Sequence, residues 1–280
     1  MKSENFRLAL ATDFVEQGAN CFIGRRGVEM LPLSSRPSIL ISYHYILTSW
    51  TSRGDCSASG SWDTLDMGRF ALRDWFLDSG AFSAWTMGKS IDLGRYRDFA
   101  KLALAQDPKL LSVFSLDVIG DWRATLRNTE RLWSDGLPVI PTYHVGAPQD
   151  VLLEMARTYP KIALGGAVGM RGKHDWAKQC FARVWPKPIH GLGFGSVETI
   201  TGLPWHSVDA TSWSASPVRY GTWRTPSPSG KRIKLRVRGS NHDLRTQVEF
   251  YLKIEKRMNA KWRRELESLN FPQDCRKWPK

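Results

Sequence analysis

The sequence predicts an α/β protein with the TIM, or (β/α)8, barrel fold, extended at its C-terminus by a basic helical segment. Three observations predict this fold. Short apolar runs alternate with stretches of helical period, about eight such runs occur in a chain of this length, and polar residues or glycines follow them. An open doubly wound sheet is the alternative, disfavoured because no G-x-G-x-x-G pattern follows the first run.

The expected strands are the apolar runs 39–47, 75–77, 110–116, 137–143, 161–164, 187–193, 204–208 and 232–238. Apolar residues at helical spacing predict helices after the N-cap Asp121 and over 151–159, 176–184 and 243–269. The Pro- and Ser-rich stretch 224–232 is expected to be a loop. These elements place the barrel at residues 39–240, after an N-terminal lead-in, 1–38. Residues 241–280 are then a basic helix that completes the barrel and contacts nucleic acid.

The positive charge of the chain is concentrated near its C-terminus. Residues 219–280 carry 17 Lys and Arg against six Asp and Glu, so they supply +11 of the net charge of +13. Such a region is typical of nucleic-acid binding, because neutralised phosphates release counterions, although a merely solvated basic helix is the alternative. The residues expected to contact nucleic acid are Trp213, Arg219, Lys231, Arg232, Lys234 and Arg236.

Other features limit the class of protein. No apolar stretch approaches the roughly 20 residues of a membrane helix, and the N-terminus lacks the features of a signal peptide, so we expect a cytoplasmic protein without membrane contacts. The four cysteines show no C-x-x-C spacing, which predicts reduced, mostly buried thiols and no metal site. No cofactor is expected. His44 and His242 are expected to be surface or capping residues.

Polar residues and glycines follow the apolar runs at their carboxyl ends. They are Asp78 and Ser79, Asp117, His144, Gly165 and Gly166, the segment 190–195, and Asp209. Because the carboxyl ends of parallel barrel strands converge on one face, these residues predict a site on that face. Two facing carboxylates suit displacement at an anomeric carbon: one attacks or stabilises C1′, and the other gives and later removes a proton.

The motifs at these strand ends resemble those of a known enzyme family. DSGAF (78–82), SLD (115–117), LGGAVG (164–169), HGLGFG (190–195) and SVDATSW (207–213) occur in the order and spacing of the tRNA-guanine transglycosylase superfamily, over roughly residues 40–215. They are most similar to the branch that puts 7-deazaguanines into DNA, known from phages and bacterial modification systems. The resemblance implies a TIM barrel that exchanges guanine for a free 7-deazaguanine base without hydrolysing the strand, in the host cytoplasm if the protein is phage-encoded.

The resemblance also implies a role for each matching residue. Asp209 would be the nucleophile on C1′ and would form a covalent glycosyl-enzyme, with Asp78 as the general acid/base. Phe82 and Leu192 would sandwich the flipped base, while Asp117 would read its guanine edge. The further contacts expected with the base are Ser79, His144, Gly165, Gly166, Ala167 and Gly193.

Three departures from the tRNA enzymes favour DNA as the polymer. The C-x-C-x-x-C zinc motif is missing, with only Cys275 in that region. Met170 and Arg171 replace a glutamate tied to an aminomethyl base, which favours the nitrile-bearing preQ0. The arginine that follows the nucleophile is shifted, with Arg219 the nearest candidate. The alternatives left open are tRNA exchange, a catalytically inactive DNA-binding barrel, and a hydrolytic glycosylase that leaves an abasic site.

Overall fold

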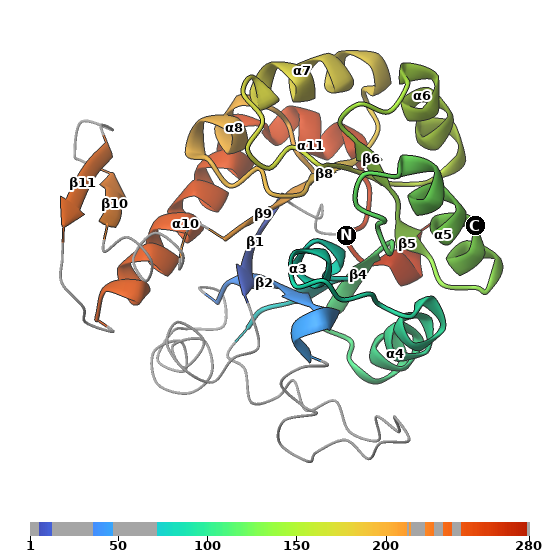
Figure 1. Ribbon diagram of the computed structural model, residues 1–280. Helices are drawn as coiled ribbons and strands as arrows, with labels where there is room; N and C mark the ends of the chain where they lie inside the picture. Colours follow the sequence, from blue (N-terminus) through green and yellow to red (C-terminus); the bar gives the residue numbers. More distant parts are fainter. Residues whose placement is uncertain are drawn as a thin grey trace.

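The protein is described by a computed structural model that covers residues 6–12, 36–46, 72–211, 213, 222–226, 232–236 and 242–278 (Figure 1). Nine parallel strands form its main sheet, in the spatial order β5-β4-β3-β2-β1-β9-β8-β7-β6. They are β1 (Arg7–Thr12), β2 (Ser38–Ser42), β3 (Trp75–Asp78), β4 (Leu110–Phe114), β5 (Val139–Ile140), β6 (Thr142–His144), β7 (Ile162–Gly165), β8 (Ile189–Gly191) and β9 (Ser207–Ala210).

The two ends of this strand order meet at Pro141. Only this residue separates β5, which pairs with β4, from β6, which pairs with β7. Proline has no N–H for the ladder and splits the strand there, but its carbonyl still accepts from the Ala163 N–H at 2.8 Å. Because β5 and β6 fill one position, the nine strands make an eight-membered (β/α)8 barrel. The predicted fold class is confirmed.

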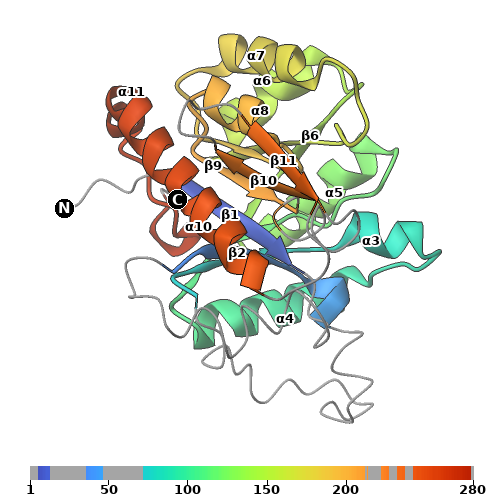
Figure 2. The same ribbon diagram turned by 90° about the vertical axis from the view of Figure 1, so that its left-hand side faces the viewer.

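A short helix, α3 (Ala81–Thr86), follows β3 directly at the carboxyl end of the barrel. The other helices surround the strands (Figures 1 and 2). They are α4 (Leu93–Gln106), α5 (Trp122–Ser134), α6 (Gln149–Thr158), α7 (Lys173–Val184), α8 (Val197–Gly202), α10 (His242–Lys261) and α11 (Arg263–Leu269). The expected N-cap at Asp121 is confirmed, since its carboxylate accepts from the Ala124 N–H at 2.9 Å. The helix expected over 243–269 is two helices, which break at Trp262. No helix in the described ranges is long and apolar enough to cross a membrane.

Two strand predictions at the borders of the barrel are wrong. β1 lies between β2 and β9, so residues 7–12 belong to the barrel and not to a lead-in that ends at residue 38. The run 232–238 lies outside the barrel, because β11 (Arg232–Arg236) pairs antiparallel with β10 (Thr222–Pro226) in a separate hairpin. β10 also replaces part of the loop expected over 224–232. The alternation of basic and apolar residues along β11 fits a two-stranded ribbon, whereas buried parallel strands are apolar on both faces.

The C-terminal helix α10 completes the helical ring, as predicted, by packing against β1. The Glu255 carboxylate accepts from the Leu8 N–H at 2.9 Å and from the Arg73 guanidinium at 2.8 Å. Asn259 donates to the Phe6 carbonyl at 3.3 Å. These contacts fix α10 beside the strand that sequence patterns missed.

Residues 271–278 close the end of the barrel at which the strands begin. Cys275 and Trp278 pack into the inner apolar cluster with Phe76 and Phe114. The Arg276 guanidinium donates to the carbonyls of Leu104, Asp107, Pro108 and Leu110, at 2.9–3.2 Å. The opposite end of the barrel, where the strands finish, carries the candidate site.

Cys275 and Cys180 are buried free thiols, as expected; Cys21 and Cys56 lie outside the described residues.

Candidate active site

Three aspartates lie at the carboxyl ends of the barrel strands. Asp78 ends β3, Asp117 follows β4, and Asp209 lies in β9. Removal from water, followed by the negative charges of Asp117 and Asp209, raises the pKa of Asp78 to about 7. Hydrogen bonds from the N–H groups of Gly80 and Ser79 oppose this shift without cancelling it. The structure therefore places Asp117 and Asp209 within electrostatic range of Asp78.

Asp209 is held by one backbone donor and one imidazole. The Gly193 N–H donates to Asp209 Oδ1 at 2.8 Å, and His190 Nε2 lies 3.5 Å from the same oxygen. Oδ2 accepts no hydrogen bond from the described part of the chain. The Gly193 N–H is thus engaged by Asp209, and the expected contact of Gly193 with the base stays a prediction.

Asp117 is paired with His144 across adjacent strand ends. His144 Nε2 lies 3.2 Å from Asp117 Oδ2. The other oxygen, Asp117 Oδ1, is buried and has no hydrogen-bond partner among the described residues. A buried polar atom in this state favours a ligand that donates to it.

The turn after β3 depends on a glycine at residue 80. Gly80 has a φ of +76°, and its N–H donates to Asp78 Oδ2 at 2.9 Å. A Cβ at this position would press against Ser42 Oγ and would lie 2.6 Å from His44 Cβ. The turn thus combines a left-handed backbone with a close approach of two barrel segments.

Gly80→Ala is expected to lower the free energy of unfolding by about 2–3 kcal/mol, because backbone strain and overpacking add at this site. Urea denaturation measures the loss. Gly88→Ala is the matched control, since Gly88 also has a positive φ, +65°, but nothing lies within 4 Å of its Cβ position. Equal losses in the two variants would contradict the packing part of this argument.

The glycine-rich strand end after β7 is close-packed on one side and open on the other. A Cβ on Gly165 would lie 2.6 Å from Thr142 Cγ2, so this position requires glycine. Gly166 has a φ of +71° and is exposed, whereas Ala167 is buried in the hydrophobic core. The Ala167 side chain therefore does not face a ligand, and the expected contacts of Gly165, Gly166 and Ala167 with the base stay predictions.

Two apolar side chains expected to sandwich the base have different surroundings. Phe82 lies on α3 and is 48% exposed, and its ring centroid is 6.1 Å from that of Trp85, which is also exposed. Leu192 is half-buried and packs against the inner barrel cluster. Phe82 is thus available to a ligand, and Leu192 lies above the barrel core.

Some expected contacts lie elsewhere. Trp213 is fully buried and its indole N–H donates to the Ala11 carbonyl at 2.9 Å, so the prediction that it stacks on nucleic acid is wrong. Ser79 is 1% exposed, and its hydroxyl accepts from the Ala81 N–H, so it supports the turn. Arg219 and Lys231 lie outside the described residues. Arg232, Lys234 and Arg236 occupy alternate positions of β11.

Sequence patterns missed three buried polar residues beneath Asp209: Lys161, His190 and Ser207. The available signal was a lysine that opens an apolar run at 161–164 and a histidine inside the motif at 190–195. His44, expected at the surface or as a cap, is 3% exposed and lies beside Gly80; that prediction is wrong. Burial of these residues depends on contacts between distant strands.

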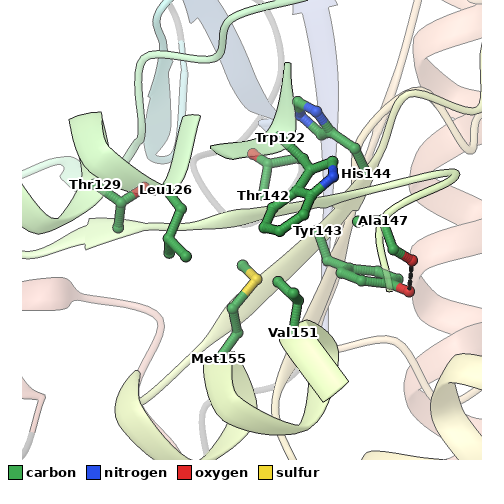
Figure 3. A pocket seen from close by; sticks show the side chains of 9 residues that line it. All are labelled: Trp122, Leu126, Thr129, Thr142, Tyr143, His144, Ala147, Val151 and Met155. Atoms are coloured by element: carbon green, nitrogen blue, oxygen red, sulfur yellow. Dashed lines mark hydrogen bonds between the residues drawn. The ribbon is translucent and has the colours of Figure 1, made fainter. Parts of the chain in front are cut away.

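A small cavity lies behind β6, between α5 and α6 (Figure 3). Its volume is about 10 Å³, enough for one water molecule at most. Trp122, Leu126, Val151 and Met155 form most of the wall in Figure 3, and the Tyr143 hydroxyl donates to the Ala147 carbonyl at 2.8 Å. This cavity is too small for a base.

Within the described ranges, no three His, Cys, Asp or Glu side chains converge to hold a metal ion.

Comparison with known proteins adds little beyond the fold. No family model matches the sequence, and no curated protein matches it. Among solved structures, the chain is similar to the tryptophan synthase subunit alpha from Campylobacter jejuni, with a TM-score of 0.42 and 11% identity. That similarity covers 89% of this chain and 96% of the other. It is too distant to bear on function, so the barrel rests on its own strand order.

Proposed function

We propose that the protein is a DNA-guanine transglycosylase, which exchanges guanine in DNA for a free 7-deazaguanine base, with preQ0 as the favoured base. The observation that carries the proposal is the Asp78 carboxyl, whose pKa of about 7 suits proton transfer near neutral pH, beside Asp209 at the same end of the barrel. The resemblance of the strand-end motifs to the transglycosylases supplies the reaction.

In the proposed reaction, an oxygen of Asp209 attacks C1′ of a guanosine that has been flipped out of the helix. The C1′–N9 bond breaks, and guanine leaves with a proton from Asp78. N9 of the incoming 7-deazaguanine then attacks C1′, loses its proton to Asp78, and releases the Asp209 carboxylate. The Gly193 N–H donates to Asp209 Oδ1 and so orients the carboxylate. The other oxygen, Oδ2, has no hydrogen bond from any described residue.

Guanine recognition is proposed for Asp117. Its buried Oδ1 has no hydrogen-bond partner in the described part of the chain, and His144 holds its other oxygen. The N1–H and 2-amino group of guanine would satisfy this oxygen, whereas adenine does not offer that pair of donors. Leaving a buried carboxylate oxygen unpaired is costly, so the site would discriminate between the two purines.

DNA as the polymer is supported by the charge of residues 219–280. β10 and β11 carry Arg224, Arg232, Lys234 and Arg236, and the register pairs Arg224 with Lys234. Two further exposed groups lie on or directly after α3: Trp85, 58% exposed, and Met87, 53% exposed. An exposed aromatic side chain on α3, the helix that follows Asp78, is suited to stacking on a base next to the flipped one.

Trp85→Ala is therefore expected to weaken DNA binding by about 5- to 150-fold, since stacking on one base contributes roughly 1–3 kcal/mol. Fluorescence anisotropy with a labelled duplex measures the effect. Trp185→Ala is the matched control, because Trp185 is also exposed, at 38%, but caps the C-terminal end of α7. Equal affinities of the Trp85 variant and the wild type would remove this residue from the interface.

The function is tested by incubating the purified protein with duplex DNA and preQ0, digesting the DNA and identifying its nucleosides by mass spectrometry. The expected product is the preQ0 deoxynucleoside. Free guanine and abasic sites without added preQ0 would favour the hydrolytic glycosylase, and incorporation into tRNA alone would favour the tRNA enzyme. Salt-sensitive DNA binding with no base exchange would identify an inactive DNA-binding barrel.

A further inference from the structure

A chain of buried polar groups runs up the barrel interior to Asp209. Gln273 Oε1, from the C-terminal segment, lies 3.0 Å from Lys161 Nζ, which lies 3.0 Å from Ser207 Oγ. Ser207 Oγ is 2.8 Å from His190 Nδ1, and His190 Nε2 is 3.5 Å from Asp209 Oδ1. Lys161, Ser207 and His190 are all 0% exposed.

The direction of each hydrogen bond in this chain follows from the groups at its lower end. Gln273 Nε2 donates to the His206 carbonyl at 2.7 Å, which turns the amide oxygen toward Lys161. The Lys161 ammonium has three N–H groups and no lone pair, so it donates to both oxygens. Ser207 Oγ therefore accepts from Lys161 and has its own proton left for His190 Nδ1.

These contacts favour one of the two neutral tautomers of His190. Burial lowers its pKa to about 4, so the imidazole is neutral near pH 7 and has one N–H group. Because Nδ1 accepts from Ser207, the proton is on Nε2, the nitrogen that faces Asp209. In the other tautomer, a lone pair on Nε2 would face the carboxylate and repel it.

We propose that Lys161 is a positioning residue for Asp209: through Ser207, it fixes the Nε2–H tautomer of His190, which stabilises the anionic nucleophile. The catalytic part of this inference rests on the proposed function. The distance of 3.5 Å is long for a hydrogen bond, and Nε2 has no other partner among the described residues. Because catalytic hydrogen bonds are often long without substrate, the contact is expected to shorten when DNA is bound.

The tautomer is measured by long-range proton–nitrogen NMR correlation on protein labelled with ¹⁵N-histidine. The chain has six histidines, and the spectrum of His190→Gln identifies the signal that is lost. The wild type is expected to show His190 neutral and protonated on Nε2 from pH 8 down to about pH 5, as its lowered pKa requires. A proton on Nδ1 in the wild type would overturn the proposal.

Two variants test the link to Lys161. Lys161→Met and Ser207→Ala are expected to shift His190 to a mixture of tautomers or to Nδ1–H, while Ser207→Thr, which keeps the hydroxyl, retains Nε2–H. Ser112→Ala is the matched control, since that buried hydroxyl donates to the Gln273 carbonyl and not to His190. An unchanged tautomer in both test variants would overturn the proposal.

In base exchange, Lys161→Met and Ser207→Ala are expected to lower kcat by about 10- to 100-fold, the range found for residues that orient the ligands of a catalytic metal. The KM is expected to change less than about twofold. Ser207→Thr is expected to restore most of the kcat, which a purely structural role would not predict. Full activity of both test variants would overturn the catalytic part. If the wild type exchanges no base, the proposed function fails, while the NMR result still decides the tautomer.

Discussion

Asp209→Asn is expected to abolish base exchange, with kcat reduced on the order of 10³-fold or more, as is found when a covalent nucleophile is removed. The amide cannot form the glycosyl ester on C1′, yet it has nearly the shape of the carboxylate. Its oxygen can still accept the Gly193 N–H, which is 2.8 Å from Asp209 Oδ1 in the wild type. The fold and the affinity for DNA are therefore expected to persist.

The measurement is nucleoside mass analysis of duplex DNA treated with preQ0, together with anisotropy for DNA binding. Asp98→Asn is the control, because Asp98 is 67% exposed on α4 and pairs with Arg97. It is expected to behave as the wild type. Undiminished incorporation by the Asp209 variant would contradict its role as the nucleophile.

Asp78→Asn is expected to lower kcat by about 10²- to 10⁴-fold, because a general acid/base contributes in this range. In the proposed reaction, Asp78 donates a proton to the departing guanine and accepts one from the incoming base. In the wild type, the pKa of about 7 predicts a limb near pH 7 in the pH profile of kcat/KM. This limb is expected to be absent from the residual activity of the variant, and a limb that persists would assign it to another group.

The same carboxyl couples stability to pH. Its pKa rises from 3.8 to about 7 on folding, so the native state binds more protons than the unfolded state between these values. The stability associated with Asp78 is therefore present below about pH 4 and is lost as pH rises through 7. Asp78→Asn removes this loss. Between pH 4 and pH 8, the stability of the variant relative to the wild type is expected to rise by on the order of 4 kcal/mol.

Urea denaturation of wild type and variant at both pH values measures this difference, within the range where both remain folded. Equal stability differences at pH 4 and pH 8 would mean that the Asp78 carboxyl is not perturbed. A gain in stability together with a loss of activity is the pattern expected where a carboxyl is kept out of water for its chemistry.

The sequence predicted the barrel and the positions of its three acids, because both signals are local. An apolar run that stops at an aspartate, as at residues 75–78, needs no knowledge of distant partners. β1 was missed because residues 7–12 become a barrel strand only by pairing with β2 and β9, and β9 is some 200 residues away. The burial of Trp213 depends on the same strand, through the Ala11 carbonyl.

The charge count near the C-terminus also overstates the surface available to DNA. Arg276 donates to four backbone carbonyls at the closed end of the barrel, and Lys261 donates to the Thr201 carbonyl at 2.6 Å. These two side chains bind backbone carbonyls of the same chain and so stabilise the fold. Composition cannot separate them from cations that contact a partner, since both kinds occur in the same basic stretch. The expected DNA contacts of Arg232, Lys234 and Arg236 remain predictions.

The most direct measurement of the central claim is the covalent intermediate itself. End-labelled duplex DNA, incubated with the wild type and run on a denaturing gel, is expected to give a protein–DNA adduct that disappears when preQ0 is added. A digest of the adduct should place the deoxyribose on the peptide that contains Asp209, and Asp209→Asn should form none. Base exchange by the wild type with no adduct on Asp209, or an adduct formed equally by the variant, would contradict the account.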